Sequence, residues 1–137
     1  MDPKDAPGRV RASFARQSMM ETLGAELVSV EPGEVLIRAP ILPGSRQQQG
    51  FAHAALSFAI GDSAAGYAAL SLLDQGFEVV TAEMRIHLLA PGKGTHLVAR
   101  GKVVRPGRRL VVVEAQVHDD EETHIAMLTG TMVPVRA

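Results

Sequence analysis

The sequence predicts an α+β fold in which an antiparallel sheet of five to six strands curves around one long central helix. Two observations predict it. A single helical segment rich in small apolar residues lies near the middle of the chain, and strand-like segments occur on both sides of it. The chain has 137 residues and is 46% apolar, which is enough to bury a core. We therefore expect one domain spanning residues 1–137.

The segments before the central helix are short and separated by turn residues. Val10 and Phe14 are four residues apart with polar residues between them, which predicts a helix over Arg9–Thr22. In Glu31–Glu34, proline and glycine stand where a type II turn requires them, so the flanking segments should form a hairpin. The expected strands are Ala25–Val30 and Val35–Pro40.

The central segment, Phe51–Leu73, carries only His53 and Asp62 as ionisable residues. It predicts a helix of about 20 residues, roughly 30 Å long. An aspartate at the centre of a membrane span costs about 2.5–3.5 kcal/mol on insertion scales. Alanine, glycine and serine also dominate the segment rather than leucine and isoleucine. A buried helix wrapped by a sheet is therefore favoured over a membrane span.

Four strands are expected after this helix, and one of them shows clear alternation. Apolar residues occupy even positions from Val80 to Leu88, whereas Thr81 and its odd-numbered neighbours are mostly polar. This pattern predicts that the even positions face the helix. A sheet of this kind leaves an edge strand to protect, so we expect a second copy to pair with it in a homodimer or homotetramer. The expected strands are Glu78–Ala90, Leu97–Val104, Leu110–His118 and His124–Val135.

Composition excludes several classes of function. Lys and Arg number 14 against 15 Asp and Glu, so there is no broad positive field to bind nucleic acid or an anionic membrane. The absence of cysteine excludes thiolate catalysis and cysteine-ligated metal. The five histidines show no metal-ligand spacing, and no cofactor is implied. The first residues are polar, without the apolar core of a signal peptide, which favours a cytoplasmic protein.

Asp62 is the most informative residue. It lies mid-helix among Gly61, Ala64 and Ala65, where a carboxylate must be paired, desolvated or used. Desolvation raises the pKa of a carboxyl group and makes it a better base. The alternative is a buried aspartate that only bonds to a serine or a backbone amide.

His53 stands at the start of the same helix, where it is either functional or only a capping residue. The amides of Ala54 and Ala55 should be free at this end, and they are candidates for an oxyanion site aided by the helix dipole. Nine residues of helix separate His53 from Asp62 by roughly 13 Å and place them on opposite faces. If both act on one substrate, two subunits must contribute to the site; otherwise only one of them is functional.

Other candidates compete with simpler explanations. Arg105, Arg108 and Arg109 flank a turn and either hold the phosphates of a ligand such as CoA or are solvated turn charges. The same alternatives apply to Arg46, just before the long helix. Ser63 lies in a near match to a nucleophile elbow, but its mid-helix position argues against a nucleophile.

These residues resemble a known family. The run from Gln47 to Ala55, Asp62 nine residues after His53, and Thr81 in a Val-Thr-Ala-Glu segment are similar to the PaaI-type acyl-CoA thioesterases of the hotdog superfamily. The resemblance covers nearly the whole chain. It implies the hotdog fold and an acyl-CoA substrate.

The resemblance also implies a role for each matching position. Asp62 takes the place of the general base or nucleophile, and the amide of Ala54 that of the oxyanion donor. Gln47 stands at a substrate-orienting Asn, His53 at the histidine that shapes the helix start, and Thr81 at a hydroxyl residue that positions water. The family also builds each site from two subunits.

The sequence departs from the family pattern at two sites, and the position of Thr81 is a third difficulty; each of them makes a requirement that the structure can test. Ala54 and Ala55 replace two glycines, so the backbone there must have negative φ. Gln47 is one methylene longer than Asn. Strict alternation would point Thr81 away from the helix, so a bulge or a site at the dimer edge is required. The leading hypothesis is an acyl-CoA thioesterase; the alternative is a non-catalytic hotdog module that binds acyl-CoA or another apolar ligand at the dimer interface.

Overall fold

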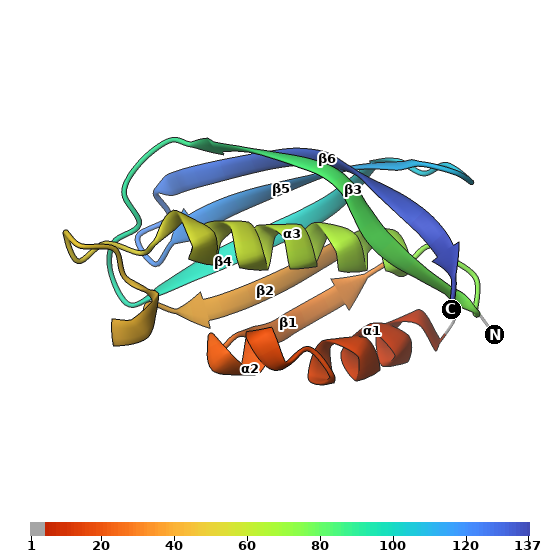
Figure 1. The fold of residues 1–137 in the computed structure, drawn as a ribbon, viewed down its shortest axis with the longest axis horizontal. Coiled ribbons are helices and arrows are strands. Elements are labelled where there is room, and N and C mark those ends of the chain that lie inside the picture. The colour runs from red at the N-terminus through yellow and green to blue at the C-terminus, as the bar shows by residue number, and fades with distance from the viewer. Residues whose placement is uncertain (1–4) are drawn as a thin grey trace.

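A computed structural model of the chain describes residues 5–137 and shows the predicted α+β hotdog fold (Figure 1). One long helix, α3, lies across the concave face of a six-stranded sheet. The helices are α1 (Ala6–Ala15), α2 (Ser18–Thr22) and α3 (Ala54–Leu70), with a short 3-10 turn, η2, at Pro43–Ser45. The strands are β1 (Glu26–Glu31), β2 (Glu34–Pro40), β3 (Phe77–Leu88), β4 (His96–Arg105), β5 (Val111–Asp119) and β6 (His124–Arg136).

Small residues bring α3 close to the sheet. Ala64, Ala65, Ala68 and Ala69 are fully buried on the helix. On β4, a Cβ atom at Gly101 would lie only 2.2 Å from the backbone carbon of Ala64, so only glycine fits. The sheet can therefore wrap the helix at backbone distance, as the small-residue composition predicted.

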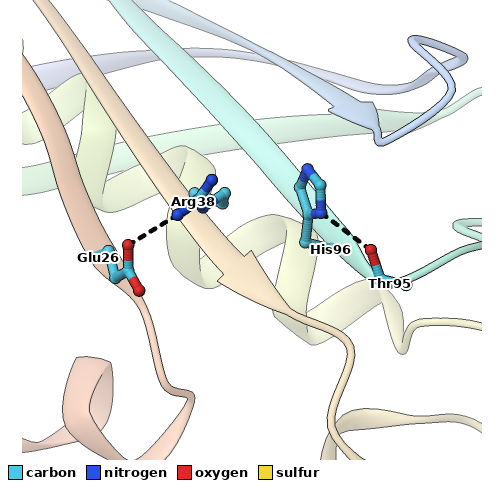
Figure 2. Close-up of polar contacts among 4 residues, drawn as sticks. All are labelled: Glu26, Arg38, Thr95 and His96. Carbon is cyan, nitrogen blue, oxygen red and sulfur yellow. Dashed lines mark hydrogen bonds and ion pairs between the residues drawn. The ribbon is translucent and has the colours of Figure 1, made fainter.

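The sheet is antiparallel throughout, in the order β1-β2-β4-β5-β6-β3. The predicted β1–β2 hairpin is present, and Gly33 adopts the positive φ of 74° that its turn requires. Arg38 donates to Glu26 across this hairpin at 3.0 Å (Figure 2). Both side chains are largely exposed, so this ion pair contributes little to stability.

The N-terminal helix differs from its prediction in two ways. It starts at Ala6 rather than Arg9, because Pro7 is well tolerated in a first helical turn. It also breaks at Gln17, whose extended backbone (ψ 92°) separates α1 from α2. The side chain of Gln17 donates to the hydroxyl of Tyr67 on α3 at 2.8 Å, a tertiary contact that helical periodicity does not reveal.

The structure of strand β3 differs from the strict alternation that the sequence predicted. The register between β3 and β6 shifts between Thr81 and Glu83, so Ala82 is an extra residue in a β-bulge. The side that faces α3 therefore changes along the strand. Val80, before the bulge, was expected on the helix-facing side and is 51% exposed, whereas Met84 and Ile86, after the bulge, pack against the core as expected. Leu88, at the end of the strand, is also 59% exposed, which the bulge does not explain.

Strand β3 lies at one edge of the sheet and pairs on one side only, with β6.

Among residues 5–137, no helix has both the length and the apolar content needed to span a membrane. The central helix is a buried core element instead, since eleven of its residues are buried.

Candidate active site

Asp62 lies on the part of α3 that faces β3 and lines a pocket of about 260 Å³. Its carboxylate is half-buried and accepts a 2.8 Å hydrogen bond at Oδ1 from the Thr81 hydroxyl. Burial raises the pKa of the Asp62 carboxyl above its ordinary value, and the Thr81 hydrogen bond lowers it by a smaller amount. A carboxylate beside a pocket with a raised pKa is suited to accept a proton.

The bulge at Ala82 explains how Thr81 reaches Asp62. Before the bulge, odd positions such as Val79 and Thr81 face α3; after it, even positions such as Met84 do. The Thr81 hydroxyl also lies 3.4 Å from the sulfur of Met132 on β6. The sequence required either a bulge or a site at the dimer edge to bring Thr81 to the helix side, and the structure has the bulge.

The first turn of α3 is capped by its own histidine. His53 is the N-cap residue, and its Nδ1 accepts the amide hydrogen of Ala55 at 2.9 Å. Of the two amides expected to be free, only that of Ala54 has no hydrogen-bond acceptor within residues 5–137. The only non-glycine residue with positive φ in that range is Glu122, so both alanines replace glycine without backbone strain.

Gln47 organises the loop before α3. Its Oε1 accepts from the amides of Gln49 at 2.6 Å and Phe51 at 3.1 Å, and its Nε2 donates to the Oε1 of Gln49. Gln47 and Ala54 line the same pocket, of about 410 Å³, which also includes Phe51 and Leu88. This second pocket places an unpaired amide beside an apolar wall.

The two halves of the expected site do not meet within one chain. The pocket at Asp62 and the pocket at Ala54 share no residue. Eight residues of helix between these positions correspond to roughly 12 Å along the axis. The geometry thus agrees with the expectation that one chain cannot bring both groups to a single substrate.

The arginines fall into two groups. Arg46 donates to the carbonyls of Gly50 and Ile41 at 2.8 and 2.9 Å, which gives it a structural role in the loop. Arg105, Arg108 and Arg109 are exposed at the β4–β5 turn. Arg108 lines a groove of about 660 Å³ at the end of α3. Arg136, which sequence reasoning did not select, lines the same groove, and its guanidinium carbon lies 5.1 Å from the centre of the Phe77 ring.

Sequence reasoning also missed a polar cluster beside Asp62. Ser13, Gln17, Ser63 and Tyr67 line the same pocket as the carboxylate. The sequence indicated Ser63 only as a candidate nucleophile, and Tyr67 could have been noticed as a hydroxyl residue five positions after Asp62, whereas Ser13 and Gln17 come from a distant segment. The Ser63 hydroxyl donates to Gln17 Oε1 at 3.4 Å, and in the described part of the chain no histidine hydrogen-bonds to Ser63, so a nucleophilic role is not supported.

No group of three or more potential metal ligands occurs within the part of the chain that the structure describes. His118 and His124 stack with ring centres 4.7 Å apart, close to the turn between β5 and β6. These histidines belong to strands, as the sequence indicated.

Comparison with known proteins decides the family. The profile of the thioesterase superfamily matches residues 49–126, which include α3, the Asp62 position and most of the sheet. The chain belongs to the thioesterase superfamily. A hydrolase of Listeria monocytogenes that acts on 1,4-dihydroxy-2-naphthoyl-CoA is 25% identical over 104 residues, covering 76% of this chain and 85% of that protein.

Solved structures extend the similarity of this thioesterase superfamily member to its whole length. A thioesterase family protein from Silicibacter pomeroyi is 36% identical with a TM-score of 0.91, covering 98% of this chain and 99% of that one. The PaaI protein of Escherichia coli has a TM-score of 0.89 at 19% identity, covering 98% of this chain and 96% of its own. The latter shows the shared fold, and the predicted resemblance to hotdog thioesterases is confirmed.

Proposed function

We propose that the protein hydrolyses acyl-CoA thioesters, with Asp62 of one subunit and the amide of Ala54 of another acting on the same substrate. The observation that carries this proposal is Asp62 itself: a half-buried carboxylate with a raised pKa, held by Thr81 at the wall of a pocket. Membership of the thioesterase superfamily supports thioester chemistry, and the Listeria relative is a CoA-thioester hydrolase.

In the proposed reaction Asp62 removes a proton from water as the water oxygen bonds to the thioester carbon. The carbonyl oxygen becomes an oxyanion, which the N–H of Ala54 stabilises with help from the α3 dipole. The C–S bond then breaks, and the CoA sulfur takes the proton back from Asp62. The products are the free acid and CoA, and the protein returns to its starting state.

Thr81 supports this step by holding one oxygen of Asp62. Because its hydroxyl donates to Oδ1, the other carboxylate oxygen is left for water. An alternative path, in which the Asp62 carboxylate attacks the thioester and forms an acyl-enzyme, uses the same residues and gives the same products.

The shared site requires two copies, and the unpaired edge of β3 is the proposed contact between them. Strand β3 carries Thr81 and borders the Asp62 pocket, so a second chain paired there would bring its own α3 near this pocket. A homodimer satisfies this geometry, and a homotetramer would contain two such pairs.

Mixing two inactive variants tests the shared site. Asp62→Asn removes the base, and Ala54→Pro removes the amide hydrogen by closing a ring on the backbone nitrogen. Proline suits the first position of a helix, and His53 already has the extended backbone (ψ 143°) that precedes proline. Each variant alone should lose turnover, by roughly 10²–10³-fold for the lost oxyanion donor.

Refolding the two variants together should restore activity. In a one-to-one mixture about half of the dimers are mixed, and each has one intact site, so about a quarter of wild-type activity should return. No recovery, with mixed dimers demonstrated by mass spectrometry, would contradict a shared site. Thermal stabilisation by acyl-CoA without release of free thiol from the wild-type protein would instead support a non-catalytic binding module.

The CoA phosphates are assigned in this proposal to Arg105, Arg108 and Arg109. All three are exposed, and within residues 5–137 no acidic side chain forms an ion pair with them. Replacing both Arg108 and Arg109 by alanine should raise KM for an acyl-CoA about tenfold, since bonds to charged groups are lost. KM for the matching acyl-pantetheine, which lacks the nucleotide, should not change. A control variant, Arg11→Ala on α1, should alter neither; equal KM changes for both substrates would remove this assignment.

A further inference from the structure

Three polar side chains form one wall of the pocket beside Asp62. Gln17 Nε2 donates to the Tyr67 hydroxyl at 2.8 Å, and the Ser13 hydroxyl lies 3.1 Å from the same oxygen. We refer to Ser13, Gln17 and Tyr67 as the polar wall. Ser13 belongs to α1 and Gln17 to the break after it, so the N-terminal helices complete this pocket.

The polar wall keeps hydrogen-bonding capacity that its internal bonds do not use. Tyr67 is only 7% exposed, whereas Ser13 and Gln17 are half-buried at the pocket. An amide carries two N–H donors and a carbonyl with two lone pairs; Gln17 uses one donor on Tyr67 and one lone pair for the Ser63 hydroxyl, which leaves one donor and one lone pair. An alkyl chain packed against this wall would remove water from these groups and give nothing in return, which is unfavourable.

The charge of the pocket adds a second restriction. Asp62 and Glu78 both line it, and among residues 5–137 no lysine, arginine or histidine does. A carboxylate at the end of an acyl chain would meet two acidic groups and no counter-ion, so the pocket disfavours it. A neutral group that donates and accepts hydrogen bonds fits both restrictions.

The position of the wall fits the far end of a short acyl group. Tyr67 follows Asp62 by five residues, a rise of roughly 7.5 Å along α3, which is about the length of a six-carbon acyl chain. Gly66 lies between them at the pocket and has no side chain to obstruct the path. A thioester carbon held at Asp62 would therefore place the end of such a chain at the polar wall.

We propose that the polar wall selects acyl groups that end in a neutral hydrogen-bonding group, such as a hydroxyl, over plain alkyl and carboxylate-ended chains. This inference rests on the proposed thioesterase function. It adds Ser13, Gln17 and Tyr67 as specificity-determining residues and assigns Glu78 to the exclusion of anionic chains.

Three acyl-CoAs that differ only at the chain end test this proposal: 6-hydroxyhexanoyl-, hexanoyl- and adipoyl-CoA. The wild-type kcat/KM should be about tenfold higher for the hydroxyl form than for the alkyl form, as expected for one or two hydrogen bonds. The adipoyl form should be the poorest substrate. Equal values, or a preference for hexanoyl-CoA, would overturn the proposal.

Substitutions in the polar wall should change the ratio of the kcat/KM values of different acyl-CoAs, and not only the rate with each of them. Tyr67→Phe keeps the buried ring, and Gln17→Leu keeps most of the side-chain volume; each should reduce the hydroxyl-to-alkyl preference severalfold. Glu78→Gln should improve adipoyl-CoA relative to hexanoyl-CoA. The matched control Arg11→Ala, an exposed residue of α1, should leave both ratios at wild-type values. Ratios unchanged in Tyr67→Phe and Gln17→Leu would show that the wall does not select substrates.

Binding separates failure of this inference from failure of the proposed function. Thioether analogues of the three acyl-CoAs cannot be hydrolysed, so their affinities for the wild-type protein, measured by calorimetry, do not depend on turnover. The same order of preference should appear in these affinities. A protein that binds in this order but releases no thiol would refute the thioesterase activity and retain the polar wall, whereas no preference in binding would refute the wall itself.

Discussion

The two functional regions of α3 differ in how their polar groups are satisfied. At the first turn, the His53 side chain accepts the amide hydrogen of Ala55, and Gln47 accepts those of Gln49 and Phe51 in the loop before it; within residues 5–137 the Ala54 amide at the start of the helix has no acceptor. In the middle of the helix, the half-buried carboxylate of Asp62 receives one side-chain hydrogen bond and has a raised pKa. The hydrogen bonds of the first region stabilise the fold, whereas burial of the Asp62 carboxylate in the second region reduces the stability of the fold. Substitution of the capping residue His53 should therefore affect mainly unfolding, and substitution of Asp62 mainly turnover; in the first region only loss of the Ala54 amide hydrogen should reduce turnover strongly.

The largest expected effect is on turnover at Asp62. Asp62→Asn preserves the shape of the side chain and an oxygen that can accept from Thr81, but it removes the base. We expect kcat to fall by roughly 10²–10⁴-fold, the contribution of a positioned base. Thiol release from an acyl-CoA panel measures this, with circular dichroism as the control for folding. Turnover equal to wild type would remove the distinction between the two regions.

A smaller effect on activity is expected at Thr81. Thr81→Val keeps the side-chain shape but removes the hydrogen bond that favours the charged form of Asp62. The pKa of Asp62 should rise further, and because the base acts when deprotonated, the acidic limb of the pH profile of kcat/KM should move to higher pH. A profile that keeps its position while the rate falls would assign Thr81 a role other than tuning this carboxylate.

The first turn of α3 should respond in stability. His53→Ala removes the side-chain cap, which typically costs about 0.5–2 kcal/mol of unfolding free energy. Urea unfolding measures this loss. His53→Asn, which offers another capping side chain, should recover most of it. If His53→Ala reduced turnover as strongly as Asp62→Asn without changing stability, His53 would be a catalytic residue rather than a cap.

The smallest effect is the dependence of stability on pH. Because the pKa of Asp62 is higher in the folded protein than in the unfolded chain, its contribution is most favourable at low pH and is lost as pH rises through the folded pKa. Asp62→Asn removes this titration. The variant should therefore be more stable than wild type at neutral pH, and the difference should shrink as the pH falls through the folded pKa of Asp62 towards the ordinary aspartate pKa. Thermal unfolding of both proteins from pH 3.5 to 7.5 measures the difference, and a constant gap would contradict the raised pKa.

The features that were predicted correctly from the sequence depend mainly on the regular periods of helices and strands and on local turn residues. The alanine-rich composition of α3 and the turn at Gly33 led to the correct order of elements, and the strand bounds are within two residues of the structure. The nine-residue spacing between His53 and Asp62 predicted that the helix start and the carboxylate lie apart, and the pocket lined by Ala54, next to His53, shares no residue with the pocket at Asp62. These features follow from helix geometry and local turn chemistry, which a single sequence records.

Features that depend on contacts between distant segments were not predictable in the same way. The break at Gln17 accompanies a bond to Tyr67, 50 residues later in the chain. The helix-facing side of β3 was predicted correctly after the bulge, at Met84 and Ile86, but wrongly before it, because one extra residue in a strand does not interrupt an alternation of apolar and polar residues. The polar wall was missed because its members lie far apart in the sequence. They form one side of a pocket only when α1 packs beside α3.

The extra residue at position 82 lets one strand serve two purposes. Ahead of it, β3 supplies a hydroxyl to the carboxylate; beyond it, the strand supplies Met84 and Ile86 to the core. If the strand kept all its residues but lost the bulge, these demands would conflict, because strict alternation places positions 81 and 84 on opposite faces and either Thr81 or Met84 would have to turn outward. The length of this strand, and not only its composition, is thus coupled to the chemistry of its neighbour.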